Sequence, residues 1–222
     1  MTLNEVVRKL DRLVAMDYAG VLLKQKTSVS FIDDDPDEVE RIVDHVLTSL
    51  ARAELVRIGA RRLRAGSFRT AFRLGDWVIK INTPEGETID RSTGKLWRNT
   101  RSYYNFGELA TYEYLHDVVE TGTDGRFRFA LTVGVSPNIL IQEYVSGDDP
   151  EESIDDVLPR SDVKFLRSLV FDIDEIHSGN WRFNRTSVDE DRVILIDLAQ
   201  TAQIPADIRD RVHRQWYNCP EG

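Results

Sequence analysis

The spacing of apolar residues changes near Leu55, and this change restricts the fold more than any other feature of the chain. Before Leu55, apolar residues recur every three or four positions over 3–17 and 33–54, which predicts two amphipathic helices. The apolar positions of the second helix are Val39, Ile42, Val43, Val46, Leu47 and Leu50. After Leu55, short runs rich in Val, Ile and Phe are separated by the turn signals "RAG" and "LGD". These runs predict an antiparallel meander with strands at 55–63, 68–74 and 77–82.

The rest of the chain continues with strands and helices. The polar stretch over 82–104 predicts a long loop, and a helix is expected over 105–119. Two more strands, over 126–135 and 138–145, would complete a five-stranded sheet. An acidic linker then precedes the C-terminal region. The elements expected in that region are one helix and a two-stranded hairpin, at 161–173, 181–184 and 192–199.

The composition is that of an acidic globular protein. The chain has 222 residues, of which 41% are hydrophobic and 30% charged, and its formal net charge is -9. This charge argues against nucleic acid as a partner. No apolar run approaches the length of about 20 residues that a membrane span needs, and residues 1–20 do not resemble a signal peptide. We therefore expect a cytoplasmic protein with no membrane partner.

Lys80 lies in the apolar run "DWVIKIN", on the same strand face as Val78. Two interpretations are open: an edge-strand lysine that limits aggregation, or a functional amine with a carboxylate partner. On the helix from residue 105, a rotation of about 100° per residue places Glu108 among apolar residues such as Leu109 and Leu115. Because a carboxylate that points toward a core is costly unless paired, we predict an ion pair between Lys80 and Glu108.

Two turns have residues suited to phosphate and metal. Gly66 and Ser67 form the turn in "RAGSFRTAF", where backbone N–H groups can approach a phosphate. Asn180 ends the stretch "EIHSGN", and Asp197 follows in "ILIDLA" after a hairpin that would bring the two together. An amide and a carboxylate oxygen suit Mg²⁺. Each residue, taken singly, is also open to interpretation as an ordinary turn residue.

The order of these segments resembles that of the protein-kinase-like superfamily over residues 55–199. The segments are "AGSFRTAF", "VIK", the helix with Glu108, "IQEYV", "EIHSGN" and "ILIDLA". The resemblance is closest to the aminoglycoside phosphotransferase type of small-molecule kinase and to small kinase-like proteins of bacteria and phages. It implies an α+β, two-lobe fold with a five-stranded antiparallel N-lobe and a truncated helical C-lobe. The implied divisions are an N-terminal helical extension at 1–53, the N-lobe at 54–146 and the C-lobe at 147–222.

The resemblance implies that ATP and Mg²⁺ are the cofactors. Gly66 and Ser67 would cover the phosphates of ATP. Lys80, paired with Glu108, would hold the α- and β-phosphates. The hinge between the lobes would be "QEYV". Its backbone would meet the adenine edge at Glu143 and Val145, with Gln142 near the gatekeeper position.

The resemblance further implies that Asn180 and Asp197 are the two Mg²⁺ ligands. Glu175 stands where the family has its catalytic Asp. A glutamate can accept a proton, but its extra methylene moves the carboxylate by about 1 Å, which weakens positioning. Asp174, like Asp172, lies close enough in sequence to replace it.

The expected activity is transfer of a phosphoryl group from ATP to a hydroxyl of a small molecule. A pseudokinase is the alternative from another class: a binding or assembly module, in a phage or regulatory complex, with a protein partner. Nucleotidyl transfer would use the same residues and is a third interpretation. Since 25 residues follow Asp197, we do not expect the platform on which protein kinases bind peptides.

Overall fold

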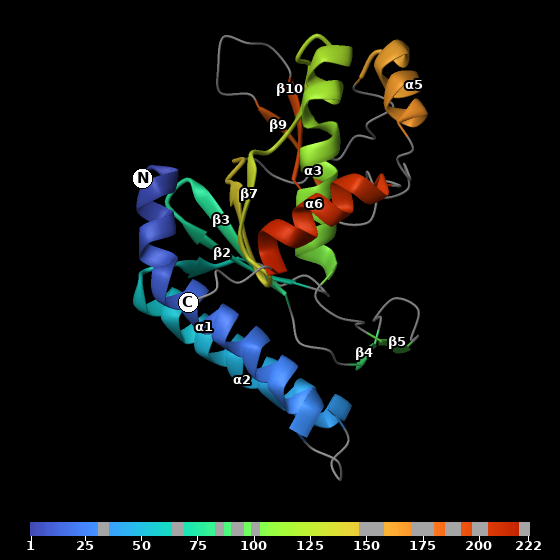
Figure 1. Ribbon diagram of the computed structural model, residues 1–222. Helices are drawn as coiled ribbons and strands as arrows, with labels where there is room; N and C mark the ends of the chain where they lie inside the picture. The colour runs from blue at the N-terminus through green and yellow to red at the C-terminus, as the bar shows by residue number, and fades with distance from the viewer. Residues whose placement is uncertain are drawn as a thin grey trace. The chain divides into compact units, whose positions relative to one another are not determined.

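A computed structural model gives the fold of the chain (Figure 1). The residues it describes are 1–30, 36–63, 69–82, 87–89, 96–98, 103–146, 158–169, 180–184, 192–196 and 204–217. The chain divides into two units. Unit 1 comprises Met1–Asn105, Gly134–Ile141 and Cys219–Gly222, and unit 2 comprises Phe106–Val133 and Gln142–Asn218.

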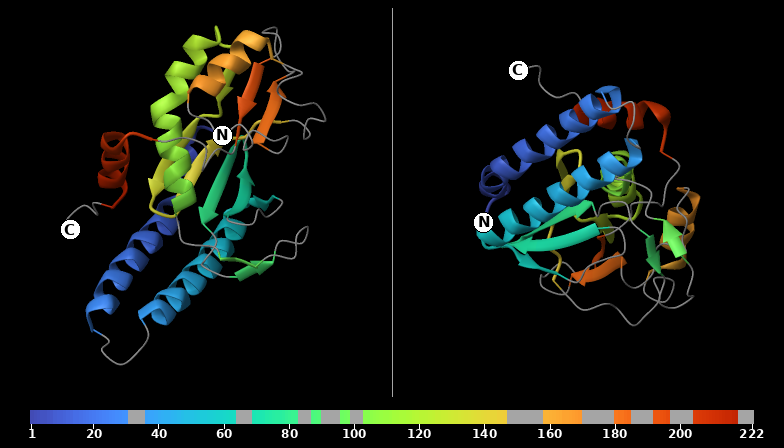
Figure 2. Two further views of the ribbon diagram at one scale, coloured as in Figure 1. Left: turned by 90° about the vertical axis from the view of Figure 1, so that its right-hand side faces the viewer. Right: turned by 90° about the horizontal axis from the view of Figure 1, so that it is seen from below.

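Unit 1 begins with the two predicted helices, α1 (Leu3–Ser30) and α2 (Pro36–Arg57), which lie side by side in both views of Figure 2. The start of α1 is fixed by a capping box between Thr2 and Glu5. The Glu5 N–H donates to Thr2 Oγ1 at 3.3 Å, and the Thr2 N–H donates to Glu5 Oε2 at 2.7 Å. Two N–H groups that have no helical acceptor are satisfied in this way. The predicted helix over 3–17 is confirmed and extends further.

The strand predicted over 55–63 is wrong, because α2 continues to Arg57 and only Arg61–Arg62 form a strand, β1. Leu55 is fully buried and continues the helical spacing from Ala51. The helix ends in a Schellman motif: the Ala60 N–H donates to the Leu55 carbonyl at 2.9 Å, and Gly59 has a φ of 86°. The predicted division between residues 53 and 54 therefore falls inside α2.

The sheet of unit 1 has five strands in the order β1-β2-β3-β8-β7, so the expected five-stranded sheet is present. The strands after β1 are β2 (Arg69–Leu74), β3 (Trp77–Asn82), β7 (Thr132–Ser136) and β8 (Ile139–Glu143). β2 pairs antiparallel with both β1 and β3, as predicted for a meander. The protein is therefore an α+β protein with a five-stranded antiparallel sheet.

One face of this sheet is buried against α1 and α2. Phe72 and Ile79, which are cross-strand partners, lie on that face. Leu10, Leu13 and Leu55 pack against it from the helices and are at most 1% exposed. Each such side chain stabilises the fold by roughly 1.5–3 kcal/mol when it leaves water. The N-terminal helices are therefore part of the core of unit 1.

The predicted loop over 82–104 contains a pair of short antiparallel strands, β4 (Glu87–Ile89) and β5 (Leu96–Arg98). Thr88 lies opposite Trp97 in this pair. The polar composition of the segment gave no alternation of apolar residues from which these strands could be predicted.

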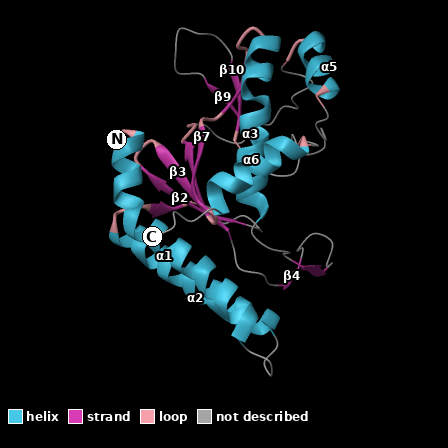
Figure 3. Ribbon diagram, viewed as in Figure 1, coloured by secondary structure: helices cyan, strands magenta, loops and turns pink. Residues whose placement is uncertain are grey.

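Unit 2 contains α3, which begins in unit 1, and a three-stranded sheet in the order β6-β10-β9 (Figure 3). The bounds are α3 (Tyr103–Gly122), β6 (Phe127–Phe129), β9 (Trp181–Asn184) and β10 (Arg192–Leu195). The hairpin of β9 and β10 is confirmed, with Trp181 opposite Leu195. The single strand predicted over 126–135 is wrong, because its residues form two strands, β6 and β7, that belong to different sheets.

The described part of unit 2 also contains two helices, α5 (Arg160–Ser168) and α6 (Ala206–Tyr217). The first confirms the helix predicted over 161–173 but ends earlier, with Leu169 as its C-cap. The second was not predicted; its spacing of Ile208 and Val212 is helical, and Val212 is fully buried. The core of unit 2 gathers side chains from α3, α5 and the three strands. Its largest member is Trp181, which is 0% exposed.

The end of α2 supplies a test of local backbone conformation. A Cβ at Gly59 would meet no atom within 4 Å, so the cost of Gly59→Ala comes only from its positive φ. We expect a loss of about 1–2 kcal/mol in the free energy of unfolding, measured with urea. Gly59→Asn is the control, since Asn tolerates this conformation better. Equal losses in both variants would contradict the explanation.

Candidate functional site

Lys80 lies on β3, the middle strand of the sheet, with β2 on one side and β8 on the other. Its side chain is 6% exposed. The interpretation as an edge-strand lysine is therefore wrong. Alternation along β3 directs Lys80 to the face opposite Ile79 and Ile81, which pack in the helix-covered core. A buried amine in a middle strand costs free energy unless its charge is compensated, and such groups are candidates for function.

The backbone of Lys80 is held by Asn105, a fully buried residue that sequence reasoning missed. The Asn105 Nδ2 donates to the carbonyl oxygen of Lys80 at 3.0 Å and to that of Asn138 at 2.8 Å. Asn105 thereby ties β3 to the turn between β7 and β8. From the sequence alone, an Asn in the first turn of a helix suggests a hydrogen bond to the nearby backbone. The sequence does not show that the acceptors of Asn105 lie far away in the chain.

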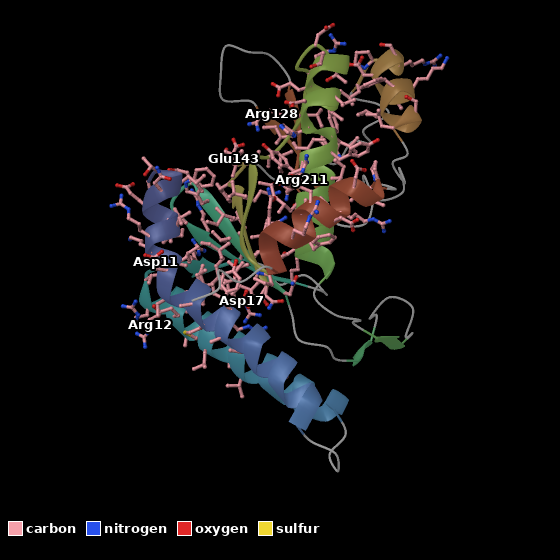
Figure 4. All side chains as sticks on the ribbon, in the orientation of Figure 1. Asp11, Arg12, Asp17, Arg128, Glu143 and Arg211 are labelled. Carbon is pink, nitrogen blue, oxygen red and sulfur yellow. The ribbon has the colours of Figure 1, made fainter. Side chains whose placement is uncertain are left out.

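The same turn is also held from α1, by Asp17 (Figure 4). Its two carboxylate oxygens accept hydrogen bonds from the Asn138 backbone N–H at 3.0 Å and the Asn138 Nδ2 at 2.7 Å. Asp17 is 8% exposed, so these charge-assisted bonds satisfy a nearly buried carboxylate. The first N-terminal helix therefore helps to position the strand pair that follows β3 in the sheet.

Glu108 on α3 is 3% exposed, as its place in the apolar sector of the helix predicts. The Gln142 Nε2 donates to Glu108 Oε1 at 2.7 Å and to Thr132 Oγ1 at 3.0 Å. All three side chains are buried. Gln142, at the predicted gatekeeper position, is thus a partner of the Glu108 carboxylate. Lys80 belongs to unit 1 and Glu108 to unit 2, and the ion pair between them stays a prediction.

Glu143, at the end of β8, forms a bidentate ion pair with Arg128 (Figure 4). The two nitrogen–oxygen distances are 2.8 and 2.9 Å. Burial alone would raise the pKa of Glu143, but the Arg128 guanidinium and the Leu131 N–H outweigh it and hold the pKa below its ordinary value. The same pair raises the pKa of Arg128. Glu143 is therefore ionised at neutral pH and fixes the end of the strand.

This arrangement limits how Glu143 could contact adenine. Its backbone N–H donates to the Leu131 carbonyl at 2.8 Å. An adenine contact through the backbone of Glu143 would therefore use its carbonyl oxygen. Val145, the other predicted adenine contact, is partly buried two residues further along the chain.

Asn180 directly precedes β9 and is 8% exposed. Its carbonyl oxygen accepts a hydrogen bond of 2.9 Å from the Ile196 N–H, which continues the pairing of β9 with β10. Asp197 is the next residue after Ile196. The hairpin therefore pairs Asn180 with Ile196. Asp197 lies outside the described residues, and the prediction that Asn180 and Asp197 bind Mg²⁺ stays a prediction.

The other predicted site residues also lie outside the described part of the chain. They are Gly66, Ser67, Asp174 and Glu175. Within the described ranges, no cluster of three or more His, Cys, Asp and Glu side chains is arranged to hold a metal ion. No helix described by the structure is long and apolar enough to cross a membrane.

Comparison of the chain with protein-family models, with curated proteins and with solved structures finds no match. The kinase-like family assignment, and the roles that it implies, therefore stay predictions.

The contact between Gln142 and Glu108 predicts a cost for removing the amide. Gln142→Leu would deprive a buried carboxylate of a donor, and we expect a loss of about 1–3 kcal/mol in the free energy of unfolding, measured with urea. Thr132→Val keeps the shape of the side chain at position 132 and leaves the hydrogen bond from Gln142 to Glu108 in place. It should cost less, about 1 kcal/mol. A larger loss in Thr132→Val than in Gln142→Leu would refute the importance of this contact.

The ion pair of Glu143 and Arg128 predicts a dependence on pH. Because the pKa of Glu143 is lower in the folded than in the unfolded protein, the pair stabilises the fold above about pH 4.3, the unfolded value. That contribution is lost as the pH falls from there through the folded-state pKa. Urea unfolding between pH 5 and 3 should show a steeper loss of stability in the wild type than in Glu143→Gln. Parallel curves would show that the pair contributes nothing.

Proposed function

We propose that the chain is a kinase-like phosphotransferase that binds ATP with Mg²⁺ and transfers a phosphoryl group to the hydroxyl of a small molecule. The observation that carries the proposal is the burial of Lys80 on the middle strand of the sheet, on the face not covered by the N-terminal helices. The charge of a buried amine has to be balanced by nearby oxygen atoms, and phosphate oxygens are among the ligands suited to it.

The hairpin of β9 and β10 supports the metal part of the proposal. Asn180 pairs through its carbonyl with Ile196, the residue before Asp197. The amide of Asn180 and the carboxylate of Asp197 fit Mg²⁺, which prefers oxygen ligands and retains positions for phosphate and water. When bound, the ion would neutralise charge that develops on the phosphates.

The chemical step would be an in-line displacement. The acceptor hydroxyl oxygen forms a bond to the γ-phosphorus, its proton passes to the carboxylate of Glu175 or Asp174, and the bond to the bridging oxygen of ADP breaks. Lys80 would hold the α- and β-phosphates, with its ammonium close to the charge that the leaving group gains.

A pseudokinase that serves as a binding or assembly module is the second candidate. Two features favour it: the longer side chain of Glu175 at the position of the catalytic base, and the hydrogen bond of the Glu143 backbone N–H to the Leu131 carbonyl, which leaves that N–H unavailable to adenine. A partner protein, in a phage or regulatory complex, would then take the place of the small-molecule acceptor.

Calorimetric titration of ATP with Mg²⁺ tests the proposed site. We expect the wild type to bind, and Lys80→Met and Asp197→Ala to weaken binding by at least about tenfold, a change of about 1.4 kcal/mol. Lys164→Met, which alters an exposed lysine on α5, is the matched control and should bind as the wild type does. No binding to the folded wild type would refute the proposal.

Turnover separates the two candidates. ATP consumption that requires an acceptor and is lost in Lys80→Met would establish the phosphotransferase. Binding without consumption, with every class of small hydroxyl compound offered, would favour the pseudokinase. Mass analysis of the modified acceptor would show whether phosphate or AMP is added.

A further inference from the structure

The five-stranded sheet is basic, although the chain as a whole is acidic. Its strands contain four arginines, one lysine and a single acid, Glu143, which is paired with Arg128. The whole chain has 38 acidic and 29 basic residues. Among the five basic side chains of the sheet, Arg69 and Lys80 are the buried ones, with 7% and 6% exposure. Two buried cations in one sheet favour an anionic ligand at this place.

Arg69 and Lys80 lie on the same face of the sheet. Lys80 lies opposite Ala71 in the pairing of β3 with β2. Because Arg69 comes two residues before Ala71, its side chain points the same way, while the alternate residue Phe72 points into the helix-covered core. Arg69 and Lys80 are thus diagonal neighbours, about 7–8 Å apart, which is within reach of long side chains. One extended ligand can contact both cations.

Asn105 connects the two basic residues. The Arg69 Nη1 donates to Asn105 Oδ1 at 3.4 Å, and the Asn105 Nδ2 donates to the Lys80 carbonyl oxygen at 3.0 Å. All three residues are buried and belong to unit 1. The acceptor is a neutral amide, so this bond positions the guanidinium without neutralising its charge. A guanidinium has five N–H donors, and its planar shape suits two parallel bonds to a phosphate group.

Arg73 is the other diagonal neighbour of Lys80, but it is held differently. Its Nε donates to the Gly75 carbonyl at 2.9 Å, in the turn that joins β2 to β3. This bond draws the guanidinium of Arg73 toward the turn, whereas Asn105 holds the guanidinium of Arg69 next to the backbone of Lys80. Arg73 therefore shares the strand, the face and the charge of Arg69 and serves as its matched control.

We propose that Arg69 is the second cation of the proposed nucleotide site, where it binds the phosphate chain together with Lys80. Arg69 is the first residue of β2, and Gly66 and Ser67, which we predict to cover the phosphates, come just before it in the sequence. This inference rests on the proposed function, because its ligand is the ATP proposed for Lys80. With two cations at diagonal positions, the site favours a chain of phosphates over a single phosphate.

Calorimetric titration with ATP and with AMP, both in the presence of Mg²⁺, tests the role of Arg69. We expect Arg69→Met to weaken ATP binding at least about tenfold and AMP binding less than about twofold, because AMP lacks the phosphates beyond the first. Arg69→Lys, which keeps the charge, should recover part of the lost affinity. Arg73→Met is the control and should bind ATP as the wild type does. Circular dichroism checks that each variant is folded.

Competition with inorganic phosphates tests the same site in the wild type, without a substitution that might disturb folding. With Mg²⁺ in excess, tripolyphosphate should compete with ATP at least about tenfold more strongly than orthophosphate does. Equal competition by the two anions would overturn the selection for a phosphate chain.

The outcomes separate this inference from the proposed function. If Lys80→Met weakens ATP binding while Arg69→Met does not, Arg69 is not part of the site, and the proposed function stands. An equal loss in Arg69→Met and Arg73→Met would also overturn the inference, because the effect would then come from the general charge of the strand. No ATP binding to the folded wild type would overturn both the inference and the proposed function.

Discussion

The burial of one face of the five-stranded sheet against α1 and α2 is the interaction on which the rest of unit 1 depends. Leu10 and Leu13 from α1 and Leu55 from α2 cover Phe72 and Ile79 of the sheet. Because this face is closed by helices, the alternate residues of β3 point to the other face, and Lys80 is among them. The same packing that stabilises the sheet therefore decides where its one buried lysine on β3 is presented.

Hydrogen bonds of buried polar side chains then position the elements next to Lys80. Asn105 and Asp17 both bond to Asn138, from the start of α3 and from α1. Each of these groups would be costly to bury without partners, so the network has few alternative arrangements. In unit 2, Gln142 likewise donates a hydrogen bond to the buried carboxylate of Glu108. Phosphate binding and phosphoryl transfer require rigid placement of polar groups, and this network is compatible with the function we propose.

The residues of the candidate site differ in how far the sequence could predict them. The burial of Glu108 followed from helix phase, and the hairpin that joins Asn180 to the segment before Asp197 followed from two apolar runs around a polar turn. Asn105 and Asp17 could not be found in this way. Their acceptors and donors lie 33 and 121 residues away in the chain, and polar residues on a helix look alike whether they face solvent or a distant turn.

The sequence by itself determined the α+β class, the two N-terminal helices, the β2–β3 hairpin and the burial of Glu108, because these depend on local periodicity and turn residues. Only the tertiary structure decided that residues 55–57 complete a helix, that 126–135 divide between two sheets, and that Val46 and Leu50 face outward. In each of these cases the local pattern suits two arrangements equally. The arrangement that forms is the one in which the apolar side chains of the segment can pack against an apolar surface of another segment, distant in the chain.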